Sequence, residues 1–205
     1  MKIIAFVSSL VLLSVSLVFA EDKDRASRLR APDGWGGERI ALPPGFARDM
    51  KLKGIEEIRF APGMFKAKSD SFFSYVFVFQ VDAEPKLTKE VLHREILTYY
   101  RGLATSVLKG SNVDVDADGF TLKLEASKAG EDAKRPKGLT SFAATLKWLE
   151  PFATRDRQTL FIDLEAWQDA QSQMNYLFVI ASPKKRTEPI WEEMKKIRAS
   201  FHQSE

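Results

Sequence analysis

The sequence predicts an α+β fold in which an antiparallel β-sheet is flanked by two helices. One long segment, residues 88–109, repeats apolar residues at helical spacing. Several shorter segments alternate apolar and polar residues across short, turn-rich connections, which favours antiparallel hairpins. A last segment, residues 189–202, again has helical spacing. Strands that are grouped apart from the helices are typical of the α+β class.

Composition sets limits on the kind of protein. The chain has 205 residues, of which 44% are hydrophobic and 29% are charged, and this suffices for one domain with a sizeable core. It contains no cysteine, which excludes disulfides, thiol nucleophiles and zinc–thiolate sites. The net charge is only +3 and acids are interspersed with bases, so we expect no nucleic-acid partner.

Residues 1–20 have the features of a secretory signal peptide. Lys2 precedes an apolar run, small residues stand at the −3 and −1 positions before Glu21, and charged residues follow. An uncleaved membrane anchor is the alternative, because the run is nearly long enough to span a bilayer. We expect cleavage, a periplasmic or secreted location, and no stable membrane anchor afterwards. Residues 21–34 are then a flexible leader and residues 35–205 a single domain.

Two or three strands are expected before the long helix. Residues 39–42 form a short edge strand that ends at a Pro-Pro-Gly turn, and residues 54–60 form the next strand. Residues 71–81 are the strongest strand, because both of its faces are apolar. A strand of that kind is expected in the centre of the sheet, covered on both sides.

The long helix carries its own start and stop signals. Thr88 is the expected N-cap, Leu87 and Leu92 are placed as a hydrophobic staple, and Gly110 is the expected residue after the helix.

Four further strands and a helix complete the expected order. The strands lie near residues 120–126, 141–148, 160–167 and 174–182, and the last of them is apolar on both faces. Pro189 opens the C-terminal helix. Its expected inward residues are Ile190, Trp191, Met194, Ile197 and Phe201.

Three stretches carry a resemblance to known proteins. GWGGERIALPPGFARDMKLKGIEEIRFAPGMF, SFFSYVFVFQ and LKWLEPFATRDRQTLFIDLEAWQ resemble a family of uncharacterised secreted bacterial proteins over most of residues 34–183. That resemblance implies no activity. The order of elements and the ending PIWEEMKKIRASFH, with Ser200-Phe201, are more remotely similar to the Mog1/PsbP-like fold. This second resemblance implies a sheet flanked by helices and a binding or assembly role, although a fold alone does not establish function.

The stretch DVDADGFTLKLE, residues 114–125, matches the spacing of an EF-hand calcium loop. Calcium takes six to eight oxygen ligands from fixed positions of such a loop. The segment after the glycine is expected to be a strand rather than a helix, so a solvated turn at Asp118-Gly119 is the alternative. The candidate ligands are Asp114, Asp116, Asp118, the Phe120 carbonyl and Glu125.

Other chemistry has little support in the sequence. His93 and His202 are too far apart to form a ligand motif, and nucleophile, P-loop and dinucleotide motifs are absent. Asp163 and Glu165 share one strand face with Trp167, so they are a possible carboxylate pair of a glycosidase type, or simply the solvent face of a strand. If an aromatic-lined pocket exists, we expect it near Tyr99 and Tyr100.

The sequence therefore favours an exported, non-catalytic domain that binds a protein partner or a small ligand, with no catalytic or cofactor-binding residues assigned. An Asp/Glu-dependent hydrolase of envelope or extracellular substrates and a calcium-stabilised structural module are the alternatives.

Overall fold

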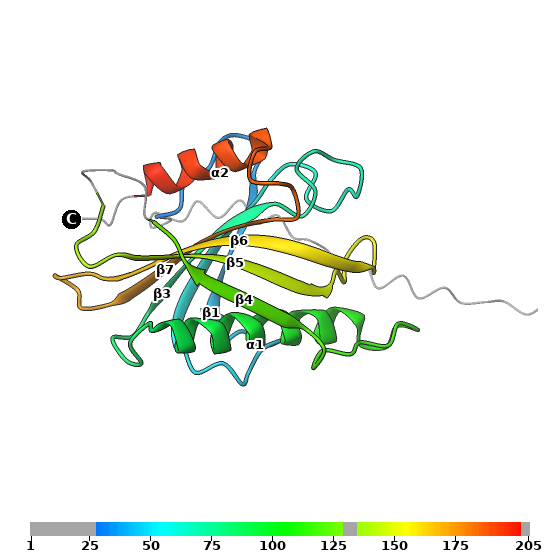
Figure 1. Ribbon diagram of the computed structural model, residues 1–205, viewed down its shortest axis with the longest axis horizontal. Coiled ribbons are helices and arrows are strands. Elements are labelled where there is room, and N and C mark those ends of the chain that lie inside the picture. Colours follow the sequence, from blue (N-terminus) through cyan, green and yellow to red (C-terminus); the bar gives the residue numbers. More distant parts are fainter. Residues whose placement is uncertain (1–27, 129–134, 202–205) are drawn as a thin grey trace, which may run out of the picture.

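The protein forms one seven-stranded antiparallel sheet with a helix on each face (Figure 1). The computed structural model describes residues 28–128 and 135–201. The strand order across the sheet is β1-β2-β3-β7-β6-β5-β4. The elements are β1 (Gly36–Leu42), β2 (Gly54–Phe60), β3 (Tyr75–Val81), α1 (Lys89–Leu108), β4 (Thr121–Ala126), β5 (Thr140–Leu149), β6 (Arg157–Gln168), β7 (Asn175–Ser182) and α2 (Pro189–Ser200).

The α+β prediction is confirmed, including the antiparallel pairing of every neighbouring strand. The additional edge strand expected at residues 39–42 is β1, which begins earlier, at Gly36. The two strands with apolar residues on both faces, β3 and β7, lie side by side in the middle of the sheet. Their position follows from the need to cover both faces.

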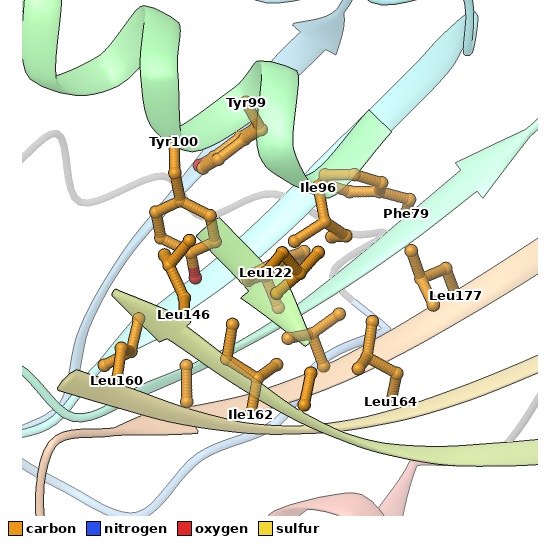
Figure 2. Packing of buried hydrophobic residues seen from close by; sticks show 14 of the residues in the cluster. Phe79, Ile96, Tyr99, Tyr100, Leu122, Leu146, Leu160, Ile162, Leu164 and Leu177 are labelled. Carbon is orange, nitrogen blue, oxygen red and sulfur yellow. The ribbon is translucent and has the colours of Figure 1, made fainter. Parts of the chain in front are cut away.

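The larger core lies between the sheet and α1. Thr88 is the N-cap of α1, and its hydroxyl accepts a hydrogen bond from the Val91 amide at 3.3 Å. Helical spacing then places Leu92, Ile96 and Tyr100 on the buried face. Figure 2 shows side chains of α1 pointing towards Leu146, Ile162 and other residues of the sheet.

The smaller core lies between α2 and the opposite face of β3 and β7. The five residues expected to point inward from the C-terminal helix are all buried there. The helix itself ends at Ser200 rather than at residue 202, and Phe201 follows as its C-cap. Figure 1 shows α1 and α2 on opposite sides of the sheet.

The strand expected at residues 71–81 begins only at Tyr75. Phe73 has a positive φ of 48°, which breaks the extended path, and its amide donates to the Met64 carbonyl at 2.9 Å. The turn carries Phe72 into the α1-side core together with Phe73, although strict alternation would place them on opposite faces.

The signal peptide expected at residues 1–20 lies outside the described residues, as do residues 21–27 of the leader. From residue 28 onward the leader contacts the domain. Leu29 is 1% exposed and belongs to the α2-side core. Alternation of apolar residues could not reveal this contact, because Leu29 is a single anchor in a polar segment.

Within the residues that the structure describes, no helix is both long enough and apolar enough to cross a membrane.

Candidate functional site

A cavity of about 510 Å³ lies beside α2, between this helix and the outer face of β5, β6 and β7. The β4–β5 connection contributes Ser127, Lys128 and Arg135 to its rim, and Arg186 comes from the segment before α2. The sheet contributes Ser141, Phe142, Ala143, Asp163, Leu164, Glu165, Phe178 and Ile180, and the C-terminal helix and its cap contribute Lys195, Arg198, Ala199 and Phe201.

The twofold alternation of β6 explains why charged residues line this cavity. Leu160, Ile162 and Leu164 belong to the core under α1, so the intervening Asp163 and Glu165 face the side of α2. The helix packs against β7 and β3, which leaves the adjoining outer face of β5 and β6 open to the cavity.

Glu165 is held by two arginines. Arg135 Nη1 donates to Glu165 Oε1 at 2.7 Å, and Arg198 Nε donates to Oε2 at 2.7 Å. Hydrogen bonds between two ionised groups are stronger than neutral ones, so they fix the position of this carboxylate. Two guanidinium groups around one carboxylate leave one positive charge uncompensated.

Asp163 has a single arginine partner. Arg186 Nε donates to Asp163 Oδ1 at 2.8 Å, and Arg186 Nη2 donates to the carbonyls of Ala144 and Ile162. The Arg186 guanidinium also lies over the rings of Phe161 and Trp191, at 5.4 and 5.2 Å. Its donors and its faces are thus engaged, which makes Arg186 a structural part of the wall.

The electrostatic balance of the cavity is positive. Five basic side chains and two carboxylates line it, which gives a net charge of +3. Within the described part of the chain, Arg198 Nη2 and Ser141 Oγ are buried polar atoms without a hydrogen-bond partner. Such atoms are uncommon in folded proteins and often mark a place where a further group binds.

The floor of the cavity is apolar. Phe178, Ile180 and Phe201 are buried residues of the α2-side core that reach its surface. Ala143 and Ala199 are small, so they leave space above that floor. A compact apolar surface next to a few fixed polar groups is the usual composition of a small-molecule site.

The carboxylate pair proposed from the sequence is thus found together, in this cavity. Trp167, however, cannot stack a sugar ring, because it is buried between Tyr176 and Arg198. The arginines and Ser141 were missed by the sequence reasoning. Arg135, Arg186 and Arg198 lie in three separate segments, and only the tertiary fold brings them together.

The structure separates the candidate calcium ligands. Asp114 and Asp116 line a cavity of about 450 Å³ together with Lys147 and Arg157. Asp116 Oδ1 accepts a hydrogen bond from the Gly119 amide at 3.0 Å. No group of three or more His, Asp or Glu residues suited to a metal ion occurs among the described residues.

The remaining candidate ligands point elsewhere. Asp118 Oδ1 lies 4.0 Å from Arg101 Nη1, and the Phe120 carbonyl accepts from Arg101 Nη2 at 3.4 Å. Glu125 lies in β4, and its carboxylate pairs with Lys123 Nζ at 2.9 Å. Calcium binding by this loop stays a prediction of the sequence.

The aromatic and histidine candidates are also placed. Tyr99 and Tyr100, near which we expected a pocket, are buried in the core under α1, and the arginine-lined cavity lies on the other face of the sheet. His93 Nε2 lies 2.9 Å from the Leu122 carbonyl and so connects α1 with β4. His202 lies outside the described residues.

Comparison with known proteins gave no match to a family model, to a curated protein or to a solved structure.

Proposed function

We propose that this protein is an exported, non-catalytic binding module whose ligand occupies the cavity between α2 and strands β5–β7. The observation that carries the proposal is the uncompensated positive charge of Arg135 and Arg198 around Glu165, above an apolar floor. A protein gains nothing in stability by grouping like charges, so a cluster of this kind in a concave site supports recognition of a ligand.

The resemblance to the Mog1/PsbP-like fold also supports a binding role, because proteins of that fold are commonly binding or assembly factors. The sheet between two helices and the burial of Phe201 after the last helix are compatible with that resemblance. We include the finer fold assignment in the proposal on this basis.

Export rests on residues 1–20. In a bacterial host, the protein should be recovered from the periplasm or the medium with Glu21 as its first residue, as N-terminal sequencing would show. Recovery with Met1 intact in the membrane fraction would contradict this part of the proposal.

The Asp/Glu-dependent hydrolase is the second candidate, because Asp163 and Glu165 line the same cavity. Glycoside hydrolysis requires one carboxyl group to give a proton and another to act as base or nucleophile. Here each carboxylate is already bonded to arginine, which opposes proton donation. Turnover of a glycoside that Glu165→Gln abolished would favour this second candidate.

A fragment screen by protein-observed NMR tests the binding role. We expect some fragments to cause saturable shifts in the backbone amides of Ala143, Glu165 and Ala199. Ala143→Leu, which fills the cavity, should abolish these shifts, while Thr145→Leu on the same strand outside the cavity should preserve them. The proposal fails if no fragment shifts the cavity amides, or if Ala143→Leu leaves the shifts unchanged.

A further inference from the structure

The geometry points to the chemical class of the ligand: an oxyanion, carboxylate or phosphate, carried on an apolar body. This inference rests on the proposed binding function and adds to it the identity of the head group and the place where it binds, between Arg135 and Arg198.

The charge of the cavity selects an anion. Besides the two arginines that share Glu165, Lys128 and Lys195 line the wall. A cationic ligand would meet the net charge of +3, whereas an anion would compensate it. The effect is larger in a partly enclosed site than in open water, because the effective dielectric constant is lower there.

Arg198 is fixed before any ligand arrives. Its guanidinium lies between the rings of Trp167 and Phe178, at 5.0 and 5.1 Å from their centroids. Its side chain is 14% exposed, and Nε is used by Glu165. Because the group cannot rotate freely, little side-chain entropy is lost when it takes a further partner.

Arg135 is the more accessible of the pair. Its side chain is 26% exposed, and its bond to Glu165 uses Nη1. A guanidinium has five N–H donors in a planar fork that matches the geometry of carboxylate and phosphate oxygens. Glu165 therefore acts as a positioning residue, which holds two such forks beside one another without satisfying all their donors.

The remainder of the cavity suits an apolar group. Its apolar floor lies beside the arginine pair, and Ala143 and Ala199 leave the space above it free. The volume of about 510 Å³ lies within the range of small-molecule pockets. A free inorganic anion would leave this apolar surface unused, so we expect the apolar body to contribute to affinity.

Calorimetric titration of the full exported chain tests the inference with four probes: phenylacetate, phenyl phosphate, the neutral isostere phenylacetamide, and inorganic phosphate. We expect phenylacetate or phenyl phosphate to bind about tenfold or more tightly than phenylacetamide, since a hydrogen bond to a charged group contributes about that factor. Inorganic phosphate should bind more weakly than phenyl phosphate. The tighter of the two anionic probes identifies the head group.

Two variants locate the site. Arg135→Gln should weaken binding of the anionic probe about tenfold, because it removes a charged donor. Arg155→Gln changes an exposed arginine of the β5–β6 loop outside the cavity and should leave binding unchanged. Circular dichroism should show that both variants keep the wild-type fold.

The outcomes separate the inference from the proposed function. If fragments occupy the cavity but phenylacetamide binds as tightly as phenylacetate and phenyl phosphate, the oxyanion inference is wrong and the binding role stands. The same conclusion follows if Arg135→Gln does not weaken the anionic probes. If neither these probes nor any fragment occupies the cavity, both are wrong.

Discussion

Buried carboxylates in this protein differ in what surrounds them. Glu150 accepts hydrogen bonds from the amides of Phe152, Ala153 and Thr154, and Glu95 accepts from the amides of Lys51 and Leu52. Glu56 receives only the Tyr99 hydroxyl, at 2.9 Å, and among the described residues its Oε2 has no hydrogen-bond partner. Glu56 is therefore the carboxylate whose ionisation the fold opposes.

The stability of the protein should consequently depend on pH through Glu56. Burial raises the pKa of Glu56 from 4.5 to about 8; the Tyr99 hydrogen bond opposes this rise, and the charge of Glu38 adds to it. Between these two pH values the unfolded chain loses a proton that the folded chain keeps. The free energy of unfolding should then fall as pH rises, by about 1.4 kcal/mol per pH unit from this group.

Glu56→Gln isolates this contribution. The free energy of unfolding, measured with urea between pH 5 and pH 8, should fall less steeply with pH in the variant than in the wild type. The advantage of the variant should grow towards pH 8. Parallel pH profiles for the two proteins would show that Glu56 ionises normally in the folded state.

The aspartates of the 114–125 loop lead to a second prediction at this scale. Because the structure directs their carboxylates to different partners, we expect millimolar calcium to leave the melting temperature unchanged. Differential scanning fluorimetry measures this directly. A calcium-dependent rise in melting temperature that Asp116→Ala abolished would instead establish the metal site.

At the scale of elements, α1 approaches the 43–50 loop more closely than most side chains would permit. Gly102 lies in α1, and a Cβ placed on it would come within 2.3 Å of the Phe46 carbonyl oxygen and 2.9 Å of Ala47 Cα. Both neighbours are backbone atoms, so neither can rotate away. The helix and the loop thus pack together only because this helical position has no side chain.

Gly102→Ala should destabilise the protein by about 1–3 kcal/mol, the usual cost of overpacking, although alanine is the better helix former. Gly45→Ala is the matched control, because a Cβ at Gly45 would meet nothing within 4 Å. Chemical denaturation should place the control near the wild type. If Gly102→Ala were as stable as that control, the close approach would be absent in solution.

The elements show which features local sequence can predict. The Thr88 cap, the positive φ of Gly110 and the Pro189 start were all readable, because these signals depend on neighbouring residues alone. The late start of β3 was not, since it depends on the Phe73–Met64 hydrogen bond.

The candidate site shows the limit of local reasoning. Alternation in β6 predicted that Asp163 and Glu165 share a face, and they do. Their arginine partners come from the β4–β5 connection, the segment before α2, and α2 itself. Sequence spacing contains no information on contacts of that range, so the net positive charge of the cavity emerged only from the fold.

At the scale of the whole molecule, the two cores are unequal, and the smaller one depends on the segment before β1. Leu29 is buried under α2, and the amides of Arg28 and Leu29 both donate to Glu57 Oε2 at 3.1 Å. Trp35 Nε1 donates to Glu193 Oε1 of α2 at 2.8 Å. The segment thus connects β2 with α2 and holds the helix that forms one wall of the cavity.

Loss of this anchor should therefore weaken the α2 side of the molecule. Leu29→Ala should lower the free energy of unfolding by about 2–4 kcal/mol, because it removes a buried leucine from a packed core. Arg30→Ala, one residue away and exposed, should have little effect. A chain beginning at residue 35 should lose more than Leu29→Ala, because the buried Glu57 carboxylate also loses two amide donors. Hydrogen exchange should then be faster in α2 than in α1, whereas equal stability of the two chains would place the start of the domain after residue 34.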